Sequence, residues 1–255
     1  MNGKVYLVGA GPGAPDLITV RGAGILARAD IVFYDALVHP ATLDYAPNAR
    51  KIAVGKRCSQ VSTDQRFINR NLIEAAAKYQ TVVRLKGGDP MLFGRAQEEI
   101  DALSAAGVSF EVVPGVTSAL AASAQIGVSL TRRGVSRSVN IATPRLGEGE
   151  EQSDWLTSAA RADTSVLYMA AGRSREIALA LSAAGMSRDT PVVIVESASL
   201  PESREICTQL GALIDAPSPE LAGPAILFLG EVFRQKMQDA AGASPSENPA
   251  RLAAG

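Results

Sequence analysis

The chain has 255 residues, of which 47% are hydrophobic and 20% are charged, and its formal net charge is −1. These values are typical of a globular protein with one or two domains. They exclude the overall basic surface that gathers nucleic acid, so an anionic ligand must be met by local arginines. No run reaches the roughly 18 apolar residues of a membrane span. We therefore expect no nucleic acid and no membrane as partner.

The two cysteines, Cys58 and Cys207, lie far apart in the sequence and match no metal-binding spacing. We therefore expect no bound metal, and a reducing, cytoplasmic setting is the simplest interpretation. The first residues lead straight into an apolar run, without the pattern of a signal peptide.

The first predicted strand, residues 5–8, opens into the glycine-rich loop G-A-G-P-G-A-P at residues 9–15. This spacing is similar to a dinucleotide-binding loop, but Pro12 has no N–H to offer a pyrophosphate. Two alternatives remain open. The loop is either a stiff turn that presses on a neutral or cationic ligand, or a plain connection to the helix predicted over residues 19–29.

Two further predicted strands, residues 31–34 and 51–54, are followed by Asp35 and Lys56. Open α/β sheets bind ligands at the carboxyl ends of their strands, so this pair could exchange protons with a substrate. The alternatives are a helix cap for Asp35 and a solvated lysine. The only histidine, His39, is expected in a solvated loop. An amphipathic helix is predicted over residues 64–79.

The most informative stretch is V-V-R-L-K-G-G-D-P-M-L-F-G-R, residues 82–95. A buried strand that stops at paired glycines indicates close approach of the backbone to a ligand. Asp89 then offers a carboxylate at the strand end. The alternative is a tight turn in which Asp89 caps the next helix.

A strand at residues 110–113 is followed by P-G-V-T-S and then by a small-residue segment, 119–125, that must pack closely. In the next loop, Arg132 and Arg133 are adjacent. Such a pair is usually solvated, but near a cleft it grips carboxylates with two hydrogen bonds.

The second half of the chain predicts another α/β unit with mixed strand directions. Its strands are expected at residues 138–143, 165–169, 191–196 and 225–229, with a helix over 174–184 and a polar connection between the last two strands. The predicted domains are residues 1–135 and 136–236, followed by a flexible tail at 237–255.

Several motifs occur in an order that resembles the tetrapyrrole methylase family. They are V-G-A-G-P-G-x-P-x-L-I-T, Y-D-x-L-V, V-G-K-R, R-L-K-G-G-D-P-x-x-F-G-R, V-P-G-V-T-S-A and G-V-S-L-T-x-R, and the resemblance covers about residues 3–235. It implies an α/β protein of the tetrapyrrole methylase fold, with two α/β domains and the cofactor cleft between them.

The resemblance also implies that S-adenosylmethionine is the methyl donor, with S-adenosylhomocysteine as its product. Asp35, Lys56 and Arg133 match catalytic positions of the family, and Arg95, Glu98 and Arg133 match positions that face the tetrapyrrole. The residues expected to bind the cofactor are Pro12, Gly87, Gly88, Asp89, Leu92, Thr117, Ser118, Met169, Pro224 and Ala225.

The reaction that the resemblance implies is methylation of uroporphyrinogen III at C2 and C7 to give precorrin-2, by a cytoplasmic homodimer. Two alternatives stay open: methylation of a later precorrin, and a catalytically silent cofactor-binding module. The chain departs from the family's usual sequence at Arg132, Pro144, Arg145, Ala170, Ser197 and Ala198. These departures concern the choice of substrate more than the cofactor.

Overall fold

The computed structural model describes residues 3–54, 65–146 and 154–242, and the chain divides into two compact units, Met1–Ala121 and Ala122–Gly255. The division lies within helix α4 (Ser118–Gln125), ahead of the boundary predicted at residue 135. Contacts of Gln125 account for the difference, because its side chain bonds to Ser203 and Ser199 and so ties the end of α4 to the second unit.

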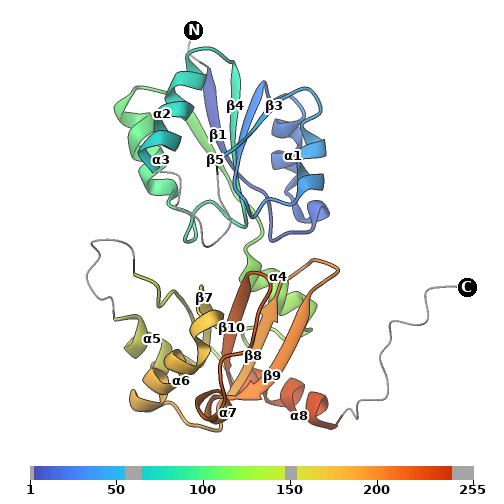
Figure 1. Cartoon of the computed structure of the whole chain (residues 1–255), viewed down its shortest axis with the longest axis vertical. Coiled ribbons are helices and arrows are strands. Elements are labelled where there is room, and N and C mark those ends of the chain that lie inside the picture. Colours follow the sequence, from blue (N-terminus) through green and yellow to red (C-terminus); the bar gives the residue numbers. More distant parts are fainter. Residues whose placement is uncertain (1–2, 55–64, 147–153, 243–255) are drawn as a thin grey trace, which may run out of the picture. The chain divides into compact units, whose positions relative to one another are not determined.

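The first unit contains a five-stranded parallel sheet with the strand order β3-β2-β4-β1-β5 (Figure 1). Short apolar runs form these strands, as the sequence predicts. The strands are β1 (Lys4–Gly9), β2 (Ile31–Tyr34), β3 (Arg50–Ala53), β4 (Thr81–Lys86) and β5 (Phe110–Val113).

Helices cover both faces of this sheet, because side chains of successive strand residues point to opposite faces. Val82 packs with Leu72 and Leu103 on one face, and Val83 packs with Leu26 on the other. Figure 1 shows α2 and α3 on one side of the sheet and α1 on the other. The helices are α1 (Val20–Leu26), α2 (Gln65–Ala76), α3 (Ala96–Ala105) and the 3₁₀ helices η1 (Pro15–Leu17) and η2 (Pro40–Tyr45).

His39 has a structural contact that the sequence did not predict. Its Nδ1 atom accepts a hydrogen bond from the N–H of Ala41 at 3.2 Å and so caps η2. The alternative in which Asp35 caps this segment is not observed, since the Asp35 carboxylate pairs with Arg84.

The second unit is built on a mixed sheet with the order β6-β7-β10-β8-β9. β6 and β7 are parallel, whereas β10 is antiparallel to both β7 and β8, which confirms the expected mixture of directions. The strands are β6 (Val139–Ala142), β7 (Thr164–Tyr168), β8 (Pro191–Glu196), β9 (Arg204–Gln209) and β10 (Ala225–Gly230).

The core of this unit lies between the sheet and helices whose apolar residues include Leu181 and Leu210. The helices are α5 (Trp155–Arg161), η3 (Ala171–Arg173), α6 (Ser174–Ala183), α7 (Leu210–Asp215), η4 (Glu231–Phe233) and α8 (Arg234–Gly242).

Two expectations for the second unit need correction. The predicted polar connection contains β9 and α7, because antiparallel pairing with β8 satisfies the backbone of a polar edge strand. The predicted tail begins inside α8, which continues to Gly242, and residues 243–255 lie outside the described part. Within the described ranges, no helix is long and apolar enough to cross a membrane.

Candidate active site

The carboxyl ends of β1, β4 and β5 meet at one edge of the first sheet, because these strands are adjacent and parallel. A Cβ atom added to Gly115 would lie 2.3 Å from the carbonyl oxygen of Gly88 and 2.8 Å from Cα of Gly9. Only glycine fits at contacts this close. The three loops therefore meet backbone to backbone, which leaves their main-chain groups near any ligand at this edge.

Replacing Gly115 by alanine is expected to lower the unfolding temperature, because the obstructing atoms belong to backbone that cannot swing away. Overpacking of this kind costs about 1–3 kcal/mol. Gly24, in α1, is the matched control, since an added Cβ there has nothing within 4 Å. Gly24→Ala should stabilise the helix by about 0.5–1 kcal/mol. Equal unfolding temperatures of Gly115→Ala and wild type in calorimetry would contradict this account.

Gly88 joins the two glycine loops. Its N–H donates to the carbonyl of Gly11 at 2.7 Å, and its own carbonyl accepts from the N–H of Gly11 at 3.3 Å. Gly88 has a φ of +69°, and, its chain neighbours aside, no atom of the described residues lies within 4 Å of where its Cβ would be. The open space beside Gly88 suits a ligand lying against the main chain. Pro12 follows Gly11 directly, so Pro12, Gly87 and Gly88 come together.

Asp89 holds two loops together through its carboxylate. Oδ1 accepts a hydrogen bond from the N–H of Met91 at 2.8 Å, and Oδ2 accepts one from the N–H of Gly115 at 2.9 Å. Leu92 lies in the same turn, with its N–H on the carbonyl of Asp89. Asp89 thus shapes the edge at which cofactor binding is predicted, and both of its oxygens already have backbone donors.

Thr117 and Ser118 stand at the start of α4, directly after the loop of Gly115. The carbonyl of Thr117 accepts hydrogen bonds from Leu120 and Ala121, so the residue begins the helix. The structure therefore collects all the predicted cofactor residues of the first unit on neighbouring loops. Their contact with a cofactor stays a prediction.

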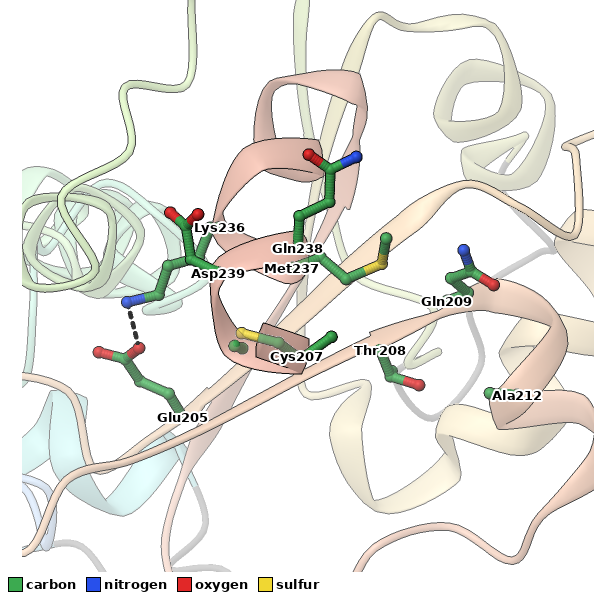
Figure 2. Close-up of a pocket in the computed structure, with 11 residues that line it drawn as sticks. Glu205, Cys207, Thr208, Gln209, Ala212, Lys236, Met237, Gln238 and Asp239 are labelled. Atoms are coloured by element: carbon green, nitrogen blue, oxygen red, sulfur yellow. Dashed lines mark ion pairs between the residues drawn. The ribbon is translucent and has the colours of Figure 1, made fainter. Parts of the chain in front are cut away.

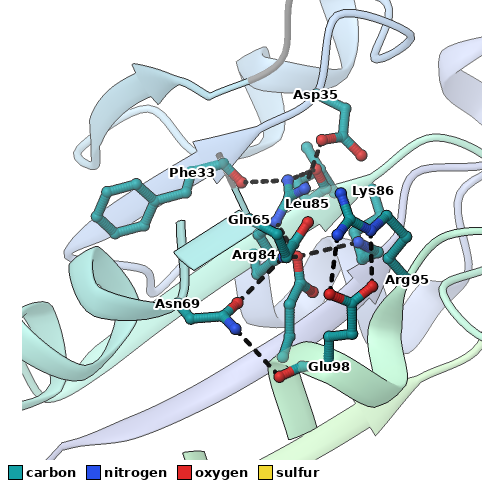
Figure 3. Close-up of polar contacts among 10 residues, drawn as sticks. Phe33, Asp35, Gln65, Asn69, Arg84, Leu85, Lys86, Arg95 and Glu98 are labelled. Atoms are coloured by element: carbon teal, nitrogen blue, oxygen red, sulfur yellow. Dashed lines mark hydrogen bonds and ion pairs between the residues drawn. The ribbon is translucent and has the colours of Figure 1, made fainter. Parts of the chain in front are cut away.

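Asp35 belongs to a buried ionic network, shown in Figure 3. Its Oδ1 lies 2.5 Å from Nη2 of Arg84, which in turn donates through Nε to Oε1 of Glu99 at 3.0 Å. The Nζ of Lys86 donates to the same Glu99 oxygen at 3.2 Å. Burial and the neighbouring Arg84 lower the pKa of Lys86, although Glu99 opposes this shift.

Sequence reasoning assigned no role to Arg84, Lys86 or Glu99. The sequence did contain a sign of their importance. Arg84 and Lys86 alternate with apolar residues in a run that has the pattern of a buried strand. The alternation places both on one face of β4. Their acidic partner, Glu99, comes from α3 and could not be matched to them without the fold.

Arg95 and Glu98, which are expected to face the substrate, form an ion pair with each other at 2.7 Å. Both side chains are about half exposed. Arg95 and Phe93 have φ values of 55° and 52°, in the left-handed region that side chains seldom adopt. Such backbone strain gathers at functional sites.

In the second unit, Met169 lies beside the turn that carries Pro224 and Ala225. The pairing of Ile226 with Tyr168 brings the start of β10 to the end of β7. Met169 has a φ of 55° and is 46% exposed, so the residue is accessible to a ligand. The structure thus brings these three predicted residues together.

Glu196 holds that turn in place from the end of β8. Its Oε1 accepts hydrogen bonds from the N–H groups of Ala222 and Gly223, at 2.5 and 2.7 Å. Its Oε2 pairs with Arg204 at 3.0 Å. Sequence reasoning did not select Glu196, and a lone glutamate at a strand end gave no sign of this role.

Arg133 is exposed in a turn that is closed by backbone hydrogen bonds between Arg132 and Ser136. Arg145, one of the departures from the family pattern, is also exposed, and its Nη1 lies 3.9 Å from the sulfur of Met169. Lys56 lies outside the described residues, so its predicted role as proton donor has no structural counterpart.

A cavity of about 600 Å³ between β9 and α8 is separate from these residues. Figure 2 shows the ion pair between Glu205 and Lys236 that spans it, with the side chain of Cys207 beside it. Burial raises the pKa of this thiol, so the thiol stays protonated and weakly reactive. No residue of the predicted site lines the cavity.

Comparison with known families identifies the class. Residues 4–214 match the model of the tetrapyrrole (corrin/porphyrin) methylases. The chain therefore belongs to the tetrapyrrole methylase family, and the family and fold predicted from the sequence are confirmed.

The chain is 44% identical to the uroporphyrinogen-III C-methyltransferase of Pseudomonas aeruginosa, over 92% of this chain and 96% of that protein. It is also 43% identical to a siroheme synthase of Zymomonas mobilis, over 90% of this chain and 49% of that protein. The chain thus spans about half the length of the siroheme synthase.

A crystal structure of a uroporphyrin-III C-methyltransferase from Thermus thermophilus, complexed with S-adenosylhomocysteine, resembles this chain with a TM-score of 0.81. That protein is 42% identical, and the match covers 91% of this chain and all of that one. A cobalt precorrin-4 methyltransferase follows with 30% identity, a TM-score of 0.79, and coverage of 90% of this chain and 95% of that one.

Proposed function

We propose that this protein transfers methyl groups from S-adenosylmethionine to C2 and C7 of uroporphyrinogen III, giving precorrin-2. The observation that carries the proposal is the 44% identity to a uroporphyrinogen-III C-methyltransferase along nearly the whole of both chains. The methyl donor is supported by the similar structure that contains S-adenosylhomocysteine. Precorrin-2 is a precursor of sirohaem, cobalamin and haem d1.

The residues present fit this donor. Gly88 leaves open space beside the main chain, and Met169 is a partly exposed residue on a strained backbone. When bound, S-adenosylmethionine supplies an electrophilic methyl group to a pyrrole carbon. The glycine loops of the first unit would hold the donor for in-line attack, so that positioning provides much of the rate.

The described carboxylate best suited to proton removal is Asp35, at the carboxyl end of β2. A ring proton must leave after the new carbon–carbon bond forms, and a positioned carboxylate can accept it. Arg84 engages Oδ1 of Asp35, which leaves Oδ2 for the substrate. Lys56 is proposed as the matching proton donor.

Uroporphyrinogen III carries many carboxylates, and arginine binds carboxylates with two parallel hydrogen bonds. Arg133, exposed in its turn, and Arg95 are proposed to hold them. Arg95 already pairs with Glu98, so a substrate carboxylate would exchange with Glu98 at this guanidinium. The protein is further proposed to act as a cytoplasmic homodimer.

The second candidate function is methylation of a later precorrin, favoured by the likeness to a cobalt precorrin-4 methyltransferase at 30% identity. This identity is lower than the 44% to the uroporphyrinogen enzyme, so it ranks second. A silent cofactor-binding module would bind the donor without any turnover.

The test is an anaerobic assay of the purified protein with S-adenosylmethionine and uroporphyrinogen III, followed by mass spectrometry of the tetrapyrrole. We expect a product that carries two added methyl groups. Parallel reactions with precorrin-2 and precorrin-4 separate the second candidate. Binding of S-adenosylhomocysteine in calorimetry, without methylation of any acceptor, would refute the enzymatic proposal and indicate a silent module.

A further inference from the structure

β4 buries charge at the centre of the first sheet. Its residues 82, 84 and 86 share one face, and along this face apolar Val82 gives way to Arg84 and Lys86. Arg84 is 2% exposed, Lys86 is 3% exposed and Glu99, which meets them from α3, is fully buried. The charges lie toward the carboxyl end of the strand, where the site is formed.

The contacts of Glu99 and Arg84 orient the Arg84 guanidinium toward Asp35. Oε1 of Glu99 accepts hydrogen bonds from Arg84, Lys86 and Gln65, at 3.0, 3.2 and 3.2 Å. Nη1 of Arg84 donates to the carbonyl of Leu85 at 3.1 Å. Nη2 is then aimed at Asp35. The guanidinium plane is thus fixed by contacts on its other nitrogens.

A network of this kind is a poor way to gain stability. Removing charges from water is costly, and apolar residues of similar volume often stabilise a protein as well or better. The four side chains carry two positive and two negative formal charges, so the cluster is neutral until Asp35 takes up a proton. Buried charges that lead to a partly exposed carboxylate at the carboxyl ends of the strands therefore favour a functional explanation.

We propose that Arg84 is a positioning residue for Asp35, and that Glu99 and Lys86 form the buried support that fixes Arg84. Arg84 binds Oδ1 of Asp35 and so directs Oδ2 toward the substrate proton. Lys86 shares the charge of Glu99, which prevents Glu99 from drawing the guanidinium away from Asp35. This role rests on the proposed function, because it gives Asp35 the part of the base.

The test combines kinetics with a measurement that needs no turnover. Arg84→Met, Arg84→Lys, Asp35→Asn and the double variant Arg84→Met/Asp35→Asn are compared in single-turnover methyl transfer and in S-adenosylhomocysteine binding. The carboxyl ¹³C chemical shift of Asp35, identified by its loss in Asp35→Asn, is compared between the variants at one pH. Arg70→Met is the control, since Arg70 forms a surface pair with Glu74 in the same unit.

We expect Arg84→Met to slow methyl transfer at least tenfold while the cofactor Kd changes less than twofold. Arg84→Lys should recover part of the rate, because lysine restores a cation near Asp35 but cannot contact Asp35 and Glu99 through separate nitrogens as arginine does. In the Asp35→Asn background, Arg84→Met should add almost nothing, since its effect passes through Asp35. The carboxyl ¹³C signal of Asp35 should move in Arg84→Met, because its hydrogen-bond donor is missing, and should stay in place in Arg70→Met.

The groups that face Asp35 through this network are Arg84 and Lys86 on β4 and Glu99 on α3. Additive losses in the double variant, or an unmoved Asp35 signal in folded Arg84→Met, would overturn the proposal. If wild type methylates no acceptor but the Asp35 signal moves as expected, the proposed function fails and the positioning of Asp35 stands. Should Arg84→Met not fold, Arg84→Lys takes its place, and an Asp35 signal identical to that of wild type would then overturn the proposal.

Discussion

Asp35→Asn is expected to reduce methyl transfer by about 10²–10⁴-fold, the range in which a positioned general base contributes to catalysis. An amide has nearly the shape of the carboxylate but cannot take up the proton that leaves the ring. Cofactor affinity should stay within about twofold, because Asp35 lies at the end of β2 and not in the glycine loops. Single-turnover rates and calorimetry with S-adenosylhomocysteine measure the two effects separately.

Asp30→Asn is the matched control for this substitution. Asp30 precedes β2, and its Oδ2 accepts backbone hydrogen bonds from Gln80 and Thr81 at 2.9 and 2.8 Å. The Asp30 variant should lose some thermal stability and keep its rate. If Asp35→Asn retains the wild-type rate, Asp35 is not the base.

Asp89→Ala is expected to weaken cofactor binding by about 1–3 kcal/mol, because two backbone N–H groups lose their acceptor. This corresponds to a rise in the S-adenosylhomocysteine Kd of about 5–150-fold. The effect arises through the loops, since the carboxylate ties the turn of Met91 to Gly115. Calorimetric titration gives the Kd directly.

Asp163→Ala removes a comparable contact far along the chain. Asp163 directly precedes β7, and its Oδ2 accepts hydrogen bonds from the N–H groups of Arg137 and Ser138. Met169 lies at the opposite end of β7. That variant should unfold at a lower temperature and bind the cofactor normally. An unchanged Kd in Asp89→Ala would remove Asp89 from the cofactor site.

The fold was predictable wherever burial and periodicity coincide. The apolar runs of β1, β2 and β4 end at glycines or an aspartate, so the ends of these strands can be recognised in the sequence. β9 was missed because its sequence, R-E-I-C-T-Q, is polar and gains its backbone partners only from β8. α5 was missed as well, since its seven residues carry little periodicity.

Without the family resemblance, the candidate site was predictable only from short motifs at the ends of strands. Paired glycines followed by Asp89 indicate a ligand loop, and the structure adds that the carboxylate bonds to Gly115, 26 residues away. The partners of Arg84 and Glu196 come from other elements, and spacing in the sequence carries no information about them. The role of a charged side chain is therefore settled by tertiary contacts.

The contact of Gly9, Gly88 and Gly115 has a consequence for how this chain tolerates mutation. A side chain at Gly9 or Gly115 would meet carbonyl groups, Cα atoms and backbone nitrogen of the neighbouring loops, and none of these can be shortened by a second substitution. A clash at either glycine therefore has no compensating replacement elsewhere, whereas at Gly88, which has open space for a Cβ, the restriction is the φ of +69°. In a saturation library Gly9 and Gly115 should accept almost no replacement, while neighbours such as Met91, whose side chain is exposed, should accept many residues.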